Sequence, residues 1–380
     1  MSLTKEWRHR IMAWRHELTN HLYTPIGSID LQAAFTKKQY RPDEALDELT
    51  FEPASPGKAW GSKWEYGWFR GELTVPDFAA GQPIALMLDV GSEAKMVIEV
   101  QQEKMVPAVE EVVAEAMVIV NGAYAGAVDN HHKVLFLTDS ASAGETYTIL
   151  FEAYAGHGPR EWRSGPTPPD RETVPEPPEN QCVIGQNHFG IWHEVAYQLM
   201  MDVETLWDVR ESIDPESMRV MEIDEGLRDF TLIADFEQPR DKMLASLQEA
   251  RKRLQPLLEK QNGDTTPEMI GFGHAHIDVA WLWPLMETER KCARTFSTQL
   301  ALMDRYPEYK FLQSQPQLYR MVKEKYPDLY KRILEAIGRG QWIPDGAAWV
   351  EPDTNIPSGE SLIRQLVHGK RFYEEEFGVN

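Results

Sequence analysis

Two histidines and an aspartate stand at alternate positions in the last third of the chain, as His274, His276 and Asp278, and Trp281 follows them. Side chains alternate between the two faces of a strand, so these three polar groups point the same way if the segment is extended. Imidazole and carboxylate groups are ligands that Zn²⁺ and similar divalent ions take in proteins. The spacing therefore predicts a metal site, and a hydrogen-bonded strand end is the simpler alternative. We expect His274 to serve differently from His276.

Polar and aromatic residues also follow two later apolar segments that have the length of strands. The first segment precedes Gln313, Ser314 and Gln315, and the second precedes Asp345, Trp349, Glu351 and Asp353. Ligands of parallel α/β folds gather at the carboxyl ends of the strands, so all these residues are candidates for one site.

Four of the candidates have an ordinary structural role as an alternative. Glu351 and Asp353 could form a carboxylate pair, or they could hold the loop by hydrogen bonds, with Asp353 as a turn residue. We expect Trp281 to form a wall of the site and Trp283 to pack under the following helix.

The segment that carries these residues alternates between strand and helix patterns. Strands are expected at 269–272, 310–314 and 341–344, and helices at 285–303, 316–338 with a break at Pro327, and 358–377. Strand–helix alternation is typical of a parallel sheet built from βαβ units. Residues 267–380 are therefore predicted to form a parallel sheet with helices between its strands.

The preceding residues show other periodicities. Residues 1–55 are expected to hold an N-terminal helix at 5–22 and an extended lead-in, residues 56–207 an all-β sandwich, and residues 208–266 a helical linker with a long helix at 240–261. The sandwich is predicted from short alternating runs at 64–73, 84–90, 117–120, 134–137 and 147–154, separated by turn signals such as Asn121-Gly122. Residues 104–115 are interpreted as an insertion, and the proline-rich residues 159–178 as a surface loop.

Composition excludes several classes of protein. The 39 basic and 60 acidic residues give a net charge of -21, which disfavours nucleic acid and anionic membranes as partners. The chain has no apolar run of about 18 residues that could span a membrane. Its two cysteines, Cys182 and Cys292, are too few for a disulfide framework or a cysteine-based zinc site, and we expect a cytoplasmic location.

The run from Gly273 to Pro284, Gly-His-Ala-His-Ile-Asp-Val-Ala-Trp-Leu-Trp-Pro, resembles the opening motif of the α-mannosidases of glycoside hydrolase family 38. Residues 311–315 and 340–362 resemble the second and third strand ends of that family, and residues 56–200 more loosely resemble its cytosolic and bacterial branch. The insertion at 104–115 is longer than is usual for that branch.

The resemblance implies a multidomain protein: an all-β sandwich, a helical linker and the first βα units of a seven-stranded β/α barrel. It implies that His276 and Asp278 are two ligands of a Zn²⁺ or another divalent ion, and that Trp281 binds the substrate, a mannose-containing oligosaccharide. The implied reaction is retaining hydrolysis through a covalent glycosyl-enzyme. The implied nucleophile would lie beyond Asn380, so we expect residues 1–380 alone to be inactive and to bind the metal weakly or not at all.

Two other functional classes stay open from the residues alone. An amidohydrolase-like metal hydrolase also opens its barrel with His-x-His on the first strand, although it leaves Trp281 and the loop after the third strand without a role. The sandwich could instead be a non-catalytic carbohydrate-binding or structural module. We also expect a homo-oligomer, because three strands of a seven-stranded barrel leave an unpaired edge and an apolar face.

Overall fold

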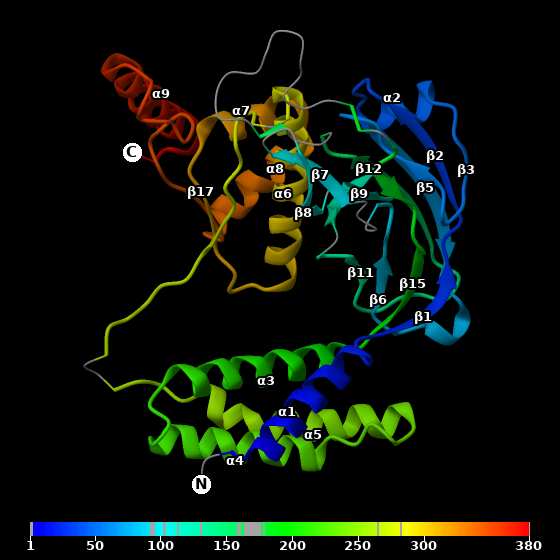
Figure 1. Cartoon of the computed structure of the whole chain (residues 1–380), viewed down its shortest axis with the longest axis vertical. Coiled ribbons are helices and arrows are strands. Elements are labelled where there is room, and N and C mark those ends of the chain that lie inside the picture. The colour runs from blue at the N-terminus through cyan, green and yellow to red at the C-terminus, as the bar shows by residue number, and fades with distance from the viewer. Residues whose placement is uncertain are drawn as a thin grey trace.

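The chain forms three parts: a helical bundle, a β-sandwich and an α/β part (Figure 1). The computed structural model describes residues 3–91, 96–101, 104–111, 114–129, 131–157, 161–162, 176–177, 179–263, 266–281 and 283–379. Helix α6 (Leu285–Arg305) of the α/β part stands beside the sandwich, and the bundle lies at the far end of the molecule.

The sandwich consists of two antiparallel sheets that pack face to face. One sheet has the order β1 (Tyr23–Ser28), β15 (His188–Trp192), β6 (Ile84–Met87) and β11 (Val134–Thr138). The other has the order β10 (Ala123–Val128), β9 (Glu115–Val120), β12 (Thr146–Tyr154), β5 (Tyr66–Thr74), β2 (Leu31–Thr36) and β3 (Glu52–Ala54). Because side chains alternate along β5, Phe69 enters the core between the sheets while Trp68 faces outward.

Smaller elements complete the sandwich. β14 (Cys182–Val183) pairs with β4 (Ala59–Trp60), and a 3₁₀ turn spans Asp77–Ala79. The expected insertion at 104–115 contributes β8 (Lys104–Glu111), which forms a separate sheet with β7 (Met96–Gln101) and β13 (Glu161–Trp162). Residues 112–113 and most of the expected loop at 159–178 lie outside the described residues.

The sandwich begins earlier than the expected residue 56. The expected lead-in contains β1, β2, β3 and α2 (Pro42–Glu48). Tyr23 pairs with Trp192, and Ala33 pairs with Phe69. These strands are short, the register of β1 shifts between Pro25 and Gly27, and β1 pairs with a strand that is distant in the sequence, so local periodicity does not reveal them.

The expected linker is part of a helical bundle. α1 (Lys5–Thr19), α3 (Glu194–Ser212), α4 (Met218–Ile233) and α5 (Arg240–Leu258) pack around buried leucines such as Leu199, Leu227 and Leu254. Ser217 caps α4 by accepting a hydrogen bond from the backbone N–H of Val220. The N-terminal helix therefore belongs to the same unit as the residues that were expected to form a linker.

His193 joins the bundle to the sandwich. Its backbone N–H donates to the carbonyl of Leu22, its Nε2 lies 2.8 Å from the hydroxyl of Thr24, and its side chain is buried. Burial, together with the positive charges of Arg240 and His21, lowers the pKa of His193 from 6.5 to about 4. The folded protein therefore holds a neutral imidazole at a pH where the unfolded chain would protonate it.

This depressed pKa predicts a loss of stability in acid. As the pH falls from 6.5 toward 4, the unfolded state takes up a proton that the folded state does not, so the free energy of unfolding decreases. Between pH 7.5 and 5, His193→Gln should reduce this loss by about 2 kcal/mol. Urea unfolding at both pH values measures it, with His131→Gln at an exposed position as the control. Equal pH dependence in His193→Gln and the unaltered protein would contradict the assignment.

The α/β part has the predicted order of elements. β16 (Gly273–His274), β17 (Phe311–Gln313) and β18 (Trp342–Pro344) form a parallel sheet, as expected. The helices between and after them are α6, α7 (Pro316–Lys325), α8 (Pro327–Gly338) and α9 (Gly359–Phe377). Tyr326 separates α7 from α8, so the break predicted at Pro327 is confirmed.

The first strand differs from its prediction. Residues 269–272 are not a strand, and Met269, Ile270 and Phe272 are exposed. The strand is the two residues of β16, because only these pair with β17. Apolar residues predict a strand from composition, but a strand also needs a neighbouring chain to bond, and within the described residues β16 has a partner on one side alone.

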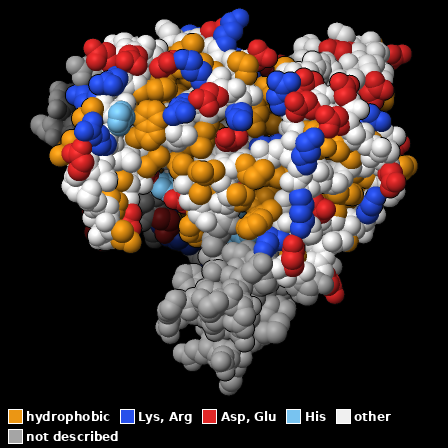
Figure 2. Space-filling model, turned by 90° about the horizontal axis from the view of Figure 1, so that it is seen from above, with side chains coloured by type: hydrophobic (Ala, Val, Ile, Leu, Met, Phe, Trp, Pro, Cys, Tyr) orange, Lys and Arg blue, Asp and Glu red, His pale blue; other side chains and the backbone are white. Residues whose placement is uncertain are grey.

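Helix α6 fixes the α/β part against the sandwich. Its Phe296 belongs to the same buried cluster as Trp68, Met117 and Leu150, which lie on the outward face of the six-stranded sheet. On the face seen from above, hydrophobic side chains gather toward the middle, with acidic and basic side chains around them (Figure 2). No helix in the described ranges has both the length and the apolar character needed to cross a membrane.

Candidate functional site

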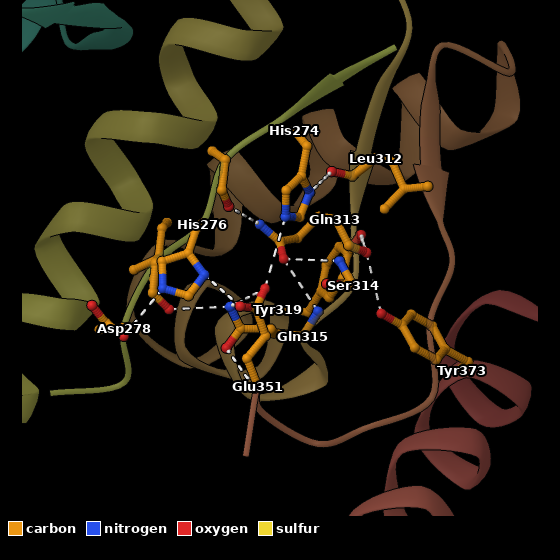
Figure 3. A network of polar contacts seen from close by, with 12 residues as sticks. His274, His276, Asp278, Leu312, Gln313, Ser314, Gln315, Tyr319, Glu351 and Tyr373 are labelled. Carbon is orange, nitrogen blue, oxygen red and sulfur yellow. Dashed lines mark hydrogen bonds and ion pairs between the residues drawn. The ribbon is translucent and has the colours of Figure 1, made fainter. Parts of the chain in front are cut away.

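The residues that follow the three parallel strands meet at one edge of the sheet (Figure 3). His274 is held there by its Nδ1, which lies 3.0 Å from the carbonyl oxygen of Leu312 on β17. The first strand end is thus tied to the second by a side chain as well as by the backbone ladder. This arrangement brings together candidates that are about 30 to 75 residues apart in sequence.

Two buried glutamines hold the first strand end in shape. Gln313 donates to the carbonyl of Ala275 at 3.3 Å, and Gln315 donates to the carbonyl of Ile277 at 3.1 Å. Their side chains satisfy backbone groups that β16 is too short to pair, so these two sequence candidates support the site rather than line it. The hydroxyls of Tyr319 and Tyr373 in turn donate to the carbonyl of Gln313.

His276 lies between two carboxylates. Its Nε2 is 3.2 Å from Oδ1 of Asp278, and its Nδ1 contacts Oε2 of Glu351. The same Glu351 approaches His274, whose Nε2 is 3.8 Å from Oε1. Burial alone would lower the pKa of His276, but the hydrogen bond to Asp278 and the charges of Glu351 and Asp278 outweigh it and raise the pKa above its ordinary value.

Trp281 stands on a tight turn beyond these groups. Ala280 has φ +68°, a left-handed conformation that costs energy for any residue other than glycine. The turn is held by Thr288 of α6, whose hydroxyl donates to the carbonyl of Asp278 and accepts from the backbone N–H of Ala280. Trp281 is 58% exposed, while Trp283 is half-buried and donates to the same Thr288 hydroxyl.

The third strand end divides its candidates among different tasks. Asp353 accepts from the backbone N–H of Asn355 at 2.8 Å, which is the turn role expected for it. Asp345 accepts from the N–H of Gly346, and Trp349 donates to the side chain of Gln317. Of these residues at the third strand end, Glu351 alone contacts the histidines. Glu351 and Asp353 therefore have different partners and no shared role.

The pair of His276 and Asp278 fits one side of a metal site. Two ligands of a tetrahedral zinc ion with bonds near 2.1 Å are about 3.4 Å apart, and the observed separation is 3.2 Å. No group of three or more histidine, cysteine, aspartate and glutamate side chains that could hold a metal ion is found in the part of the chain that the structure describes. The described residues therefore supply two donor atoms and not a complete set of ligands.

Sequence patterns missed one residue of this site and one contact within it. Thr288 gives no signal, because its role depends on a turn that only the fold creates. Glu351 was a candidate, but its contact with His276 spans 75 positions and was not predicted. The useful signal was that Glu351 follows the third strand, at the same sheet edge as the histidines.

Comparisons with known proteins agree with this architecture. Residues 25–174 match the jelly roll domain of α-mannosidases, and residues 266–380 match the N-terminal domain of glycosyl hydrolases of family 38. The candidate site lies within the residues that match the family 38 domain.

Known α-mannosidases are similar in sequence to this chain along most of its length. α-Mannosidase 2C1 of Homo sapiens is 28% identical and covers 95% of this chain, and α-mannosidase G of Dictyostelium discoideum is 30% identical and covers 87%. The chain is therefore related to the α-mannosidases of glycosyl hydrolase family 38. It spans 32% and 28% of the lengths of these two relatives, about a third. A β-glucuronidase of Faecalibacterium prausnitzii aligns over 45% of this chain and 32% of its own, with 14% identity and a TM-score of 0.26, which is too weak to carry an argument.

Proposed function

We propose that this chain forms the metal-binding and sugar-binding part of a retaining α-mannosidase. The observation that carries the proposal is the pair of His276 and Asp278, which lies beside the exposed Trp281 at the carboxyl edge of a parallel sheet. The matched family domain contains all three residues. The substrate class we propose is a mannose-containing oligosaccharide, in line with the names of the relatives.

The residues of this chain would act by binding and orientation. His276 and Asp278 would hold a divalent cation. Zn²⁺ is the ion we propose, because it accepts nitrogen and oxygen ligands of this kind, and it would polarise sugar oxygens as a Lewis acid. Trp281 would offer its indole face to the apolar face of a pyranose, and its ring packs edge to face against Trp283, with the ring centroids 5.4 Å apart. Retaining hydrolysis needs a carboxylate nucleophile and an acid, and we assign neither role to a described residue.

Three further parts of the proposal have indirect support. A seven-stranded β/α barrel fits the three parallel βα units that begin here. A homo-oligomer fits the exposed Ile363 and Leu366 on α9, which leave an apolar surface to cover. A cytoplasmic location fits Cys182 and Cys292, which are both buried free thiols.

The test is an activity assay on the protein at the full length that its gene encodes. We expect turnover of 4-nitrophenyl α-mannoside, loss of turnover with a chelator, and recovery on adding Zn²⁺. The controls are 4-nitrophenyl acetate and an anilide, which an amidohydrolase-like enzyme would cleave. Cleavage of these without cleavage of the glycoside would refute the proposal, and so would binding of mannosides on a glycan array without any turnover.

A further inference from the structure

A basic cavity lies between helices α7 and α9, and the histidines and carboxylates of the candidate site do not line it. Its volume is about 420 Å³, which is within the range of small-molecule sites. Trp349, from the loop after β18, and Phe372 of α9 give it an aromatic part, with ring centroids 5.7 Å apart and ring planes at 89°. The basic side chains that line it are Arg320 of α7 and Arg364, His368 and Arg371 of α9.

The basic side chains of α9 are arranged so that they repel one another. Arg364, His368 and Arg371 stand at i, i+4 and i+7, which places them on one face of the helix. The two arginines carry positive charges, and the histidine between them adds a third when it is protonated. The whole chain has a net charge of -21, so this gathering of basic groups is a local exception. A bound anion would offset their repulsion.

The cavity also has more hydrogen-bond donors than acceptors. Arg320 and Arg364 each form an ion pair through Nε with a glutamate of the same helix, at 2.9 and 2.7 Å. Among the described residues, no partner is found for their Nη groups or for the side chains of His368 and Arg371. Glu375 is the one acidic residue among the described residues that line the cavity. A ligand that fits should therefore supply acceptor oxygens and negative charge.

The aromatic wall is fixed in place by hydrogen bonds. The backbone N–H of Trp349 donates to the carbonyl of Gln365 at 3.1 Å, and its carbonyl accepts from the N–H of Gln317 at 3.1 Å. The indole Nε1 of Trp349 donates to Oε1 of Gln317 at 2.9 Å. A preformed wall reduces the entropy that a ligand loses on binding. The loop after β18 thus contributes Trp349 to this cavity and Glu351 to the candidate site.

We propose that the cavity binds a phosphate group, either as part of a phosphorylated sugar or as free phosphate. A phosphate monoester carries about −1.5 to −2 charges near neutral pH, and guanidinium groups bind its oxygens through paired, charge-assisted hydrogen bonds. Trp349 and Phe372 offer an apolar contact for the ring of a phosphorylated sugar. This site goes beyond the function proposed above, because it requires neither a metal ion nor turnover of a mannoside.

The test is calorimetry on the protein at the full length that its gene encodes, with mannose 6-phosphate, inorganic phosphate and mannose as separate titrants. Both phosphate compounds should bind. Arg371→Gln should weaken their binding by about 10–100-fold, because a hydrogen bond to a charged group contributes that much. Lys370→Gln is the matched control, since Lys370 is the exposed neighbour of Arg371 and does not line the cavity. It should bind both compounds normally.

A second variant should raise the affinity. Glu375→Gln removes the acidic side chain from the cavity, so phosphate binding should become roughly 2–5-fold tighter, the range for exposed charge pairs. Misfolding cannot produce such a gain, and near-ultraviolet circular dichroism shows that Arg371→Gln is folded. Any binding of mannose should be the same in both variants, because mannose has no phosphate group.

The outcomes decide for or against the site. If neither phosphate compound binds, or if folded Arg371→Gln binds them with unchanged affinity, the proposal is wrong. Phosphate binding that is lost in His276→Ala but kept in Arg371→Gln would place the anion at the proposed metal site and would also overturn it. Tighter binding of mannose 6-phosphate than of inorganic phosphate would support the phosphorylated sugar as the ligand, and equal affinities would support phosphate alone.

Discussion

Replacing His276 or Asp278 with alanine in the protein at the full length that its gene encodes should lower the affinity for Zn²⁺ by more than 100-fold, which exceeds the effect of removing a partner of a ligand. Each side chain would supply one of two neighbouring donor atoms, 3.2 Å apart, and a single remaining donor holds an ion poorly. Because the side chains are 56% and 43% exposed, either change should alter the free energy of unfolding by no more than about 0.5 kcal/mol.

Isothermal calorimetry at fixed pH measures the affinity, and urea unfolding shows that the fold is intact. His274→Ala is the matched control, because the Nδ1 of His274 is engaged with the carbonyl of Leu312 and its Nε2 faces Glu351. We expect this variant to lose less affinity than the other two. Stoichiometric Zn²⁺ binding that survives in His276→Ala with Asp278→Ala would show that the ion binds elsewhere.

The sequence allowed the α/β part to be predicted because its signals are local. The repeat of Ala293, Phe296, Leu300 and Met303 along α6 is the apolar face that packs in the core, and it defines a helix without reference to any neighbour. Parallel strands separated by helices follow from the order of such segments. His276, Asp278 and Trp281 could be placed at a strand end for the same reason.

The features that could not be predicted from the sequence depend on contacts between residues that are far apart in the chain. β1 is a strand because Tyr23 meets Trp192, and Glu351 is part of the site because Gln315 holds it there. Met269 and Ile270 were predicted to lie in a strand, since they are apolar, yet they are outside the sheet and 94% and 79% exposed. An apolar side chain favours burial, but it becomes buried only where the fold provides a surface for it to pack against.

The junction between α6 and the sandwich also went unpredicted, and beside its apolar contacts it contains four buried charged residues. Arg290 of α6 donates to Glu152 of β12 at 2.6 Å and to the carbonyl of Tyr40, while Arg294 pairs with Glu287. A second layer joins Glu287 to the hydroxyl of Tyr66, and Lys291 and Arg294 to Glu115. Each charge has an opposite charge as its partner, so the removal of one leaves another buried without compensation.

Arg290→Ala should therefore lower the free energy of unfolding by about 3–5 kcal/mol, the range for breaking a buried ion pair. Arg290→Met combined with Glu152→Leu should cost far less, because both charges are then absent and the volume is kept. The exposed pair of Lys252 and Glu249 is the control, and Lys252→Ala should change stability by less than about 1 kcal/mol. Urea unfolding of the three proteins measures these differences.

The same variants test whether the sandwich supports the site. Thr288, which holds the carbonyl of Asp278, lies in the first turns of α6, between Glu287 and Arg290 of the charged junction. If the junction fixes the position of α6, Arg290→Ala should weaken Zn²⁺ binding as well as stability, and the double variant should restore much of both. A loss of stability with unchanged Zn²⁺ affinity would instead show that Thr288 and the sheet edge position Asp278 without help from the sandwich.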